Sequence, residues 1–166
     1  MAPATGAGAE MRTAELTWSD VLGLSLTVAE EVRRERIDAV VAVLRGGIYP
    51  ALIIAARLNI DRVYEVEFRR YSDEKPPREI HGEPLLLRDS VPQLNGERVL
   101  VVDDIARTGL TLKAARELLI SKGAGEVKTA VLVVRSREMV EVPDYYAIFM
   151  TSCPVFPWER YESEEG

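Results

Sequence analysis

Cysteine and histidine are almost absent from this chain of 166 residues. The single cysteine, Cys153, excludes an internal disulfide and a cysteine-based structural zinc site, and it favours a reducing compartment. The single histidine, His81, has no neighbours that could complete a metal site, so we expect it to be exposed to solvent. Because most basic residues are arginines, any anion site must rely on guanidinium groups or on backbone N–H groups.

Excess basic charge and long apolar runs are also missing. The net charge of -6 argues against a nucleic-acid-binding surface, and no apolar run is long enough for a membrane span. The first ten residues lack the basic start and the Leu-rich stretch of a signal peptide. We therefore expect a cytoplasmic protein with neither nucleic-acid nor membrane partners. Residues 1–12 are interpreted as a disordered tail and residues 162–166 as a solvated acidic tail.

The length and the 47% hydrophobic content predict a single domain over residues 13–161. Between the two tails, short apolar runs alternate with amphipathic segments. The amphipathic segments predict helices at 17–37, 50–58 and 109–122. The apolar runs predict strands at 38–44, 62–68, 99–102, 128–134 and 145–150. This alternation predicts an α/β fold with an open, mainly parallel sheet flanked by helices.

The segment 69–97 is charged and rich in proline, and it has no clear pattern of its own. Such a long loop is uncommon in a compact domain unless it has a function or pairs as a hairpin. We keep two interpretations: a mobile active-site lid, or a two-strand excursion with Pro-rich turns. The aromatic segment PVFPWERY, residues 154–161, is expected to form a cap or a subunit contact.

The most informative run is VLVVDDIARTGLT, residues 99–111, in which a buried strand, two acids and a Thr-Gly-x-Thr turn precede a helix. Ligands of open α/β sheets bind beyond the carboxyl ends of strands, and a helix N-terminus there favours a phosphate group. Thr108 and Thr111 add hydroxyl groups, while Gly109 lets the backbone approach the anion. The turn therefore predicts a site for a phosphomonoester.

The adjacent acids, Asp103 and Asp104, need a separate explanation. In an extended chain their side chains diverge, so both cannot bind one small ion. If the chain turns there, each can accept a hydrogen bond from one of two neighbouring ribose hydroxyls, and their charge would favour a sugar that becomes cationic. The alternative is an acid pair that caps the next helix, although capping does not explain the Thr-Gly-x-Thr turn.

Residues 99–111 resemble the motif that binds phosphoribosyl pyrophosphate (PRPP) in type I phosphoribosyltransferases. Leu44-Arg45-Gly46-Gly47 resembles the pyrophosphate loop of that family in its position after the first strand, although such a turn alone is weak evidence. The resemblance covers nearly the whole chain. The flanking segments LTW (16–18), PDYY (143–146) and FPWERY (156–161) resemble small archaeal and bacterial purine phosphoribosyltransferases.

The resemblance implies the type I fold, with a small hood from the chain ends, and a role for each matched residue. Asp103 and Asp104 would hold the ribose hydroxyls, and Arg45 would neutralise the leaving pyrophosphate; these three are the candidate catalytic residues. Mg²⁺ would be bound mainly through PRPP, with no metal ligand assigned to the chain, and the protein would be a homodimer or a higher homo-oligomer. The candidate PRPP-binding residues are Arg45, Gly46, Gly47, Asp103, Asp104, Ala106, Arg107, Thr108, Gly109, Leu110 and Thr111.

Three positions depart from the 6-oxopurine members of the family. Arg107 replaces an Asp that handles a proton of the purine ring, and an arginine cannot act as a general base at neutral pH. Arg135 stands where a lysine commonly meets the 6-oxo group, and Cys153 where an aromatic residue stacks on the base. Adenine-specific members also lack the Asp, which makes adenine a candidate base. The candidate base-binding residues are Arg135, Cys153, Pro154 and Val155.

Other readings of these positions stay open. Arg107 could instead strengthen the phosphate site, and Arg135 could donate to an oxygen as a lysine would. Phe156 and Trp158 could form an apolar wall for the base, or belong to a hood or a dimer contact.

The expected function is that of a purine phosphoribosyltransferase of purine salvage. It would transfer ribose 5-phosphate from PRPP to adenine or a 6-oxopurine, giving the nucleoside monophosphate and pyrophosphate. The alternative is a PRPP-binding regulatory protein with little or no transferase activity.

Overall fold

The computed structural model describes residues 13–69 and 83–159 of the chain. The predicted tails at 1–12 and 162–166, and His81, lie outside the described residues. The elements follow the chain in the order β1 (Thr13–Glu15), α1 (Trp18–Val32), β2 (Ala39–Leu44), α2 (Ile48–Arg57), β3 (Val63–Arg69), β4 (Leu85–Asp89), β5 (Arg98–Ala106), α3 (Leu110–Ser121), β6 (Glu126–Val134), β7 (Tyr145–Phe149) and β8 (Cys153–Val155).

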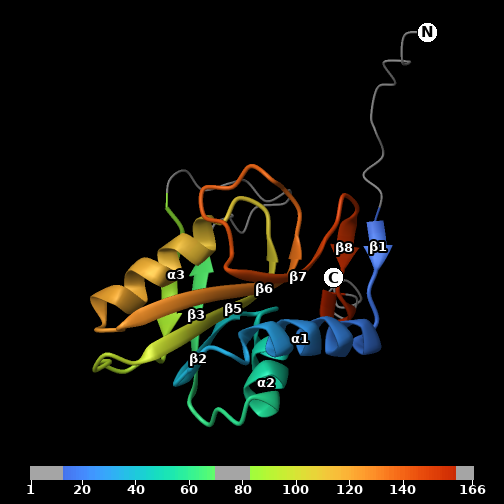
Figure 1. Cartoon of the computed structure of the whole chain (residues 1–166). Helices are drawn as coiled ribbons and strands as arrows, with labels where there is room; N and C mark the ends of the chain where they lie inside the picture. Colours follow the sequence, from blue (N-terminus) through green and yellow to red (C-terminus); the bar gives the residue numbers. More distant parts are fainter. Residues whose placement is uncertain (1–12, 70–82, 160–166) are drawn as a thin grey trace, which may run out of the picture.

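Six of these strands form one sheet in the order β4-β3-β2-β5-β6-β7 (Figure 1). All neighbours are parallel except β3 and β4, which run antiparallel. From β2 the chain winds outward to β3, whereas from β5 it winds the opposite way to β6 and β7. The reversal lies between β2 and β5, and the predicted open, mainly parallel α/β sheet is confirmed.

Helices cover both faces of the sheet, with α3 on one side and α1 and α2 on the other (Figure 1). Alternate residues of β2 point to opposite faces of the sheet, and both faces are apolar. Val40 and Ala42 pack into the cluster with α1 and α2, while Val41 and Val43 pack into the cluster with α3. A strand buried on both faces needs an uninterrupted apolar sequence, and β2 and the start of β5 have one.

Helix α1 begins with a capping box, in which Thr17 Oγ1 accepts from Asp20 N and the Asp20 carboxylate accepts from Thr17 N. It ends at Val32, so the predicted end at residue 37 is wrong. The segment beyond Val32 is held in another conformation because the Glu35 carboxylate accepts hydrogen bonds from Arg98 Nη2 at 3.0 Å and from the Tyr145 hydroxyl at 2.8 Å. These contacts tie the end of α1 to β5 and β7.

The structure resolves part of the ambiguous segment 69–97. Leu85–Asp89 form the edge strand β4, which pairs with β3 and is supported by an ion pair between Glu67 and Arg88 at 2.6 Å. The segment therefore contains one strand that pairs antiparallel with β3, which agrees with the pairing part of the hairpin interpretation. Residues 70–82 lie outside the described residues, so the active-site lid stays a prediction.

The two ends of the described chain meet in a separate parallel sheet of β1 and β8, where Thr13 pairs with Cys153 (Figure 1). Phe156 and Trp158 follow β8 and are buried in the main core at 1% and 6% exposure. Their rings stack with centroids 4.7 Å apart. Of the interpretations of these two residues, a hood packed on the same chain fits, and a dimer contact is wrong because the side chains are already buried.

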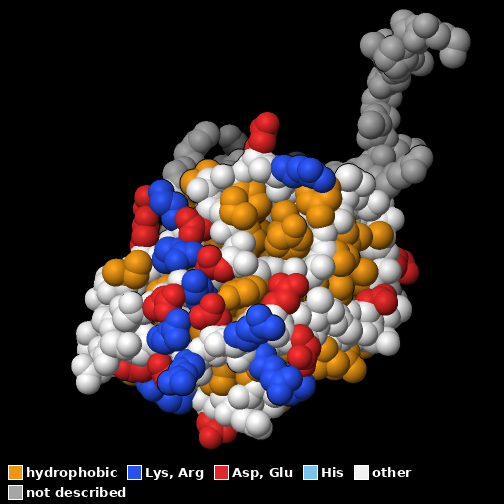
Figure 2. Space-filling view, viewed as in Figure 1, with side chains coloured by type: hydrophobic (Ala, Val, Ile, Leu, Met, Phe, Trp, Pro, Cys, Tyr) orange, Lys and Arg blue, Asp and Glu red, His pale blue; other side chains and the backbone are white. Residues whose placement is uncertain are grey.

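The surface carries both signs of charge. Figure 2 shows Lys and Arg side chains interspersed with Asp and Glu over one face, with hydrophobic side chains gathered beside β7. Tyr146 and Phe149 of β7 are 44% and 38% exposed. None of the helices in the described ranges combines the length and apolar character that crossing a bilayer requires.

The burial of Phe156 leads to a stability prediction. Replacing it with alanine should lower the free energy of unfolding by about 3–5 kcal/mol, the usual cost of emptying a buried aromatic site. Phe149→Ala is the matched control, because its ring is already partly exposed, and it should cost much less. Urea denaturation followed by circular dichroism measures both. Equal losses would show that the C-terminal hood does not contribute to the core.

Candidate functional site

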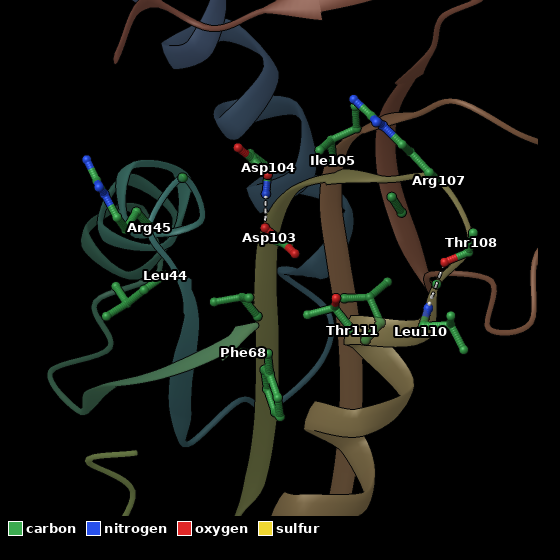
Figure 3. Close-up of a pocket in the computed structure, with 15 residues that line it drawn as sticks. Leu44, Arg45, Phe68, Asp103, Asp104, Ile105, Arg107, Thr108, Leu110 and Thr111 are labelled. Carbon is green, nitrogen blue, oxygen red and sulfur yellow. Dashed lines mark hydrogen bonds between the residues drawn. The ribbon is translucent and has the colours of Figure 1, made fainter. Parts of the chain in front are cut away.

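A cavity of about 360 Å³ lies at the carboxyl ends of β2 and β5 (Figure 3). Its wall is formed by the end of β2 and the turn after it, the end of β5 with its following loop, and Phe68 of β3. Every predicted PRPP-binding residue except Gly47 lines this cavity. Those that do are Arg45, Gly46, Asp103, Asp104, Ala106, Arg107, Thr108, Gly109, Leu110 and Thr111.

The register of the sheet explains where the cavity opens. Strand β5 pairs with β2 only as far as Val102, but it pairs with β6 as far as Ala106. Residues 103–106 therefore have a neighbouring strand on one side only. The helices that follow β2 and β5 depart to opposite faces, which leaves a crevice between the strand ends. The acids lie within β5, not after it as predicted, because β6 continues alongside them.

Asp103 and Asp104 diverge, as the sequence predicts for neighbouring residues in an extended strand (Figure 3). They are joined by one hydrogen bond, in which Asp104 N donates to Asp103 Oδ1 at 2.8 Å. Helix α3 has Gly109 at its N-cap position, with no capping side-chain hydrogen bond in this described part of the chain. The helix-capping alternative for the two acids is therefore wrong.

Burial makes ionisation of this pair costly. Removal from water raises the pKa of Asp103 well above its usual value, and the negative charge of Asp104 raises it further. Burial also raises the pKa of Asp104, although a hydrogen bond with Asp103 opposes the effect. Two carboxyl groups in this state would gain from a ligand that brings hydroxyl donors or a cation.

The Arg45-Gly46-Gly47 turn packs directly against Asp104. A Cβ on Gly46 would overlap Asp104 Oδ2 and would lie 3.2 Å from Trp158 Nε1. A Cβ on Gly47 would overlap Val43 O and would lie 2.6 Å from Val102 O. Glycine is thus required by close backbone approach at both positions. The peptide bond between Leu44 and Arg45 is cis.

Three aromatic side chains pack beside this turn, and the contact of Tyr49 with the two tryptophans was not predicted. Tyr49, in the first turn of α2, stacks on Trp158 with centroids 4.4 Å apart, and Trp18 of α1 meets Tyr49 edge-on at 5.2 Å. The two tryptophans and the tyrosine come from three distant parts of the sequence. Only the shared aromatic character of these segments could have indicated the contact.

The loop from Ala106 to Thr111 places the N-terminal end of α3 at the cavity. Gly109 has a φ of 81°, a left-handed conformation that other residues adopt only with strain. Thr108 Oγ1 accepts a hydrogen bond from Leu110 N at 3.3 Å. With no acidic side chain in its first turn, the start of α3 offers N–H groups and a positive dipole end to an anion.

The predicted base-binding residues lie beside the cavity, and none of them lines it. Arg107 connects the two regions, since it lines the cavity and places Nη2 4.0 Å from Cys153 Sγ. Arg135 donates from Nη2 to Thr151 O at 3.2 Å, and its Nε is buried without a hydrogen-bond partner among the described residues. Pro154 and Val155 belong to β8. Their role in base binding stays a prediction.

The described residues contain no group of three His, Cys, Asp or Glu side chains that could hold a metal ion. The cavity offers two carboxyl groups, Asp103 and Asp104. Such oxygen ligands suit Mg²⁺, which keeps several waters and is commonly shared between one or two carboxylates and the phosphates of a substrate.

Comparison with known proteins points to one family. A model of the phosphoribosyl transferase domain matches residues 20–164. The xanthine-guanine phosphoribosyltransferase of Idiomarina loihiensis is 27% identical over 148 residues, which are 88% of this chain and 86% of that protein. The bifunctional protein PyrR of Halalkalibacterium halodurans is 36% identical over 86 residues, which are 50% of this chain and 48% of that protein.

A solved structure gives the same indication. The purine phosphoribosyltransferase of Pyrococcus horikoshii is similar to this chain with a TM-score of 0.75 and 29% identity, covering 89% of this chain and 94% of that one. The family match includes both the turn at 45–47 and the loop at 106–111.

The raised pKa of Asp103 predicts a pH-dependent stability cost. Because the folded state binds this proton more tightly than the unfolded chain does, its contribution to stability is full below the ordinary pKa of 3.8 and is lost as pH rises through the raised value. Asp103→Asn should therefore leave the melting temperature of the ligand-free protein nearly unchanged at pH 3. At pH 8 it should raise that temperature by several degrees, since 1 kcal/mol corresponds to roughly 2–4 °C in a chain of this size.

Asp61→Asn is the control, because Asp61 is exposed and lies away from the cavity. Differential scanning calorimetry of the three proteins from pH 3 to pH 8 measures the effect. A melting temperature for Asp103→Asn that falls below that of the wild type at pH 8 would contradict the prediction.

Proposed function

The chain belongs to the phosphoribosyl transferase domain family, and from this premise we propose that it is a purine phosphoribosyltransferase. It transfers ribose 5-phosphate from PRPP to a purine base, giving the nucleoside monophosphate and releasing pyrophosphate. The observation that carries the proposal is one cavity that gathers the start of α3, a pair of carboxyl groups and an arginine turn.

Each part of the cavity suits one part of PRPP. The start of α3, with Thr108 and Thr111, binds the 5-phosphate through N–H and hydroxyl groups. Asp103 and Asp104 accept hydrogen bonds from the two ribose hydroxyls, which offset the cost of burying the carboxylates. Arg45 and the N–H groups of its turn bind the pyrophosphate.

The reaction then needs little covalent chemistry from the protein. The bond from the ribose C1 to the pyrophosphate oxygen breaks ahead of bond formation, and the electron pair leaves with pyrophosphate. A nitrogen of the base then bonds to C1 and gives up its proton to pyrophosphate or water, because Arg107 cannot accept it. The two carboxylates favour the positive charge that develops on the sugar, and the turn at Arg45 favours the charge that develops on the leaving group. Positioning and exclusion of water supply the rest, and we propose that the part of segment 69–97 that precedes β4 closes over the site.

Mg²⁺ bound to PRPP would neutralise negative charge on the pyrophosphate and so make it a better leaving group. Mg²⁺ would be held mainly by the phosphate oxygens of PRPP, and because the two acids diverge, only one of Asp103 and Asp104 could contact it, directly or through water. We also propose that the chain assembles as a homodimer or a higher homo-oligomer, because hydrophobic side chains such as Tyr146 and Phe149 are exposed at the sheet edge. The cytoplasmic location expected from the composition stays a prediction.

The base is proposed to lie next to Arg107 and Arg135, beside Cys153, Pro154 and Val155. Both arginines are donors only, so they can bind an oxo group or a ring nitrogen but cannot accept from an amino group. Arg135, Cys153, Pro154 and Val155 do not line the cavity. The shape of the cavity therefore does not select between adenine and the 6-oxopurines, and both are retained as candidate substrates.

A second candidate is a PRPP-binding regulatory protein with little transferase activity. The observations that favour it are the similarity to a protein named bifunctional PyrR and the altered residues at Arg107 and Arg135. Incubation with PRPP, Mg²⁺ and each of adenine, hypoxanthine, guanine, xanthine and uracil, with pyrophosphate release as the readout, separates the two. Turnover with a purine supports the transferase. PRPP binding without turnover on any base supports the regulator, and an absence of PRPP binding rejects both.

The variant with Asp103→Asn and Asp104→Asn tests the ribose site. The amide side chains keep the size of the carboxyl groups but lose their charge, so we expect kcat/KM for PRPP to fall by about 100-fold or more. The fold should be retained, and Asp61→Asn should keep wild-type activity. Initial rates and circular dichroism of the same samples provide the measurements. Near-normal turnover in the double variant would remove the two acids from the mechanism.

A further inference from the structure

The outer side of the phosphate-binding turn rests on the β6–β7 loop, residues 135–144. Val140 N donates to Thr108 O at 2.8 Å. Gly109 approaches the backbone of Glu141 so closely that a Cβ there would overlap Glu141 O and would lie 2.9 Å from Glu141 N. Figure 1 shows this connection passing beside the start of α3. The position of the turn therefore depends on where the β6–β7 loop is held.

One side chain of α3 holds the middle of that loop. Arg116 Nε donates to Glu141 Oε1 at 2.6 Å, and Nη1 of the same guanidinium donates to Val127 O at 2.8 Å. The Arg116 and Glu141 side chains are only 26% and 23% exposed, so their ion pair is shielded better than an ordinary surface pair. Arg116 Nη2 also reaches Asp144 Oδ2 at 3.3 Å.

The C-terminal end of the loop has an anchor of its own. Asp144 Oδ2 accepts from Thr129 N at 2.9 Å, and Thr129 Oγ1 accepts from Asp144 N at 3.1 Å. Thr129 is fully buried. Asp144 would therefore stay in place without Arg116, whereas the described hydrogen bonds of the Glu141 side chain are all with Arg116. Loss of Arg116 should free the middle of the loop selectively.

We propose that Arg116 is a positioning residue for the 5-phosphate of PRPP and acts through Glu141. The inference rests on the proposed function. The N-terminal end of helix α3 binds the phosphate, and Arg116 in the same helix holds the β6–β7 loop through Glu141. The turn at Thr108 and Gly109 is therefore fixed on one side by α3 and on the other side by that loop. Without Arg116, the backbone N–H groups lose their fixed orientation toward the anion, and PRPP binds more weakly.

Arg116→Met tests this role, because methionine keeps much of the aliphatic stem and removes the charge. We expect the KM for PRPP and the Kd of PRPP with Mg²⁺, measured by calorimetry, to rise roughly tenfold, as mutations in a coupled network commonly produce. The KM for the base and kcat should change less than about twofold, since Arg116 and Glu141 contact neither the acids nor the proposed base residues. Arg135 at the start of the loop is held separately by Ala106 O and Thr151 O. A purely structural role would lower all activities together through loss of folded protein.

Arg57→Met is the matched control. It also breaks an arginine ion pair, with Glu30 at 2.8 Å on the surface, and it should leave the KM for PRPP unchanged. Glu141→Gln is the second variant, retained in case Arg116→Met folds poorly, and it should weaken PRPP binding in the same direction. If the two residues act together, the double variant should bind PRPP no more weakly than Arg116→Met alone.

Three results would overturn the inference. They are wild-type PRPP affinity in folded Arg116→Met, equal losses for PRPP and the base, or fully additive effects of the two substitutions. A wild-type chain that bound no PRPP would overturn the proposed function together with this inference, whereas the first three results leave the proposed function intact.

Discussion

Two neighbouring, partly buried carboxyl groups at the end of β5 are the constraint around which this site is built. Asp103 and Asp104 occupy the stretch where β5 has lost β2 but still pairs with β6, so the sheet itself fixes their backbone. Their burial raises the pKa of each acid, and the protein retains an unfavourable feature that a compact core would otherwise avoid. Carboxyl groups of this kind are expected where a ligand supplies hydrogen-bond donors or a cation. The same burial that lowers the stability of the ligand-free protein therefore favours ligand binding.

Much of this arrangement could be predicted from the sequence because it is encoded locally. The valine runs of β2 and β5 predict buried strands, and the Thr-Gly-x-Thr turn predicts a helix start beside the two acids. The end of α1 at Val32 was not predictable from periodicity, since it depends on contacts of Glu35 with β5 and β7. The strand β1 has only three residues and no alternating pattern, and it exists because β8 pairs with it.

Within the site, local sequence identified the residues but not what supports them. Gly46 was predicted only as part of a pyrophosphate loop, and its surroundings show a further reason for glycine: Asp104 and Trp158 leave no room for a side chain. Contacts between Gly46 and Trp158, or between Arg116 and Glu141, join segments that are distant in the sequence. No short motif records them, and only the packed chain brings them together.

The pairing of β1 with β8 places the first and last described strands side by side, and Trp158 lies just beyond them under the turn at Gly46. During synthesis, the amino-terminal half of the site therefore emerges long before the aromatic support that it needs. Contacts of such long range between the ends of the chain slow folding. Products of premature termination would carry the whole run from Val99 to Thr111 and still lack Trp158 under the turn at Gly46.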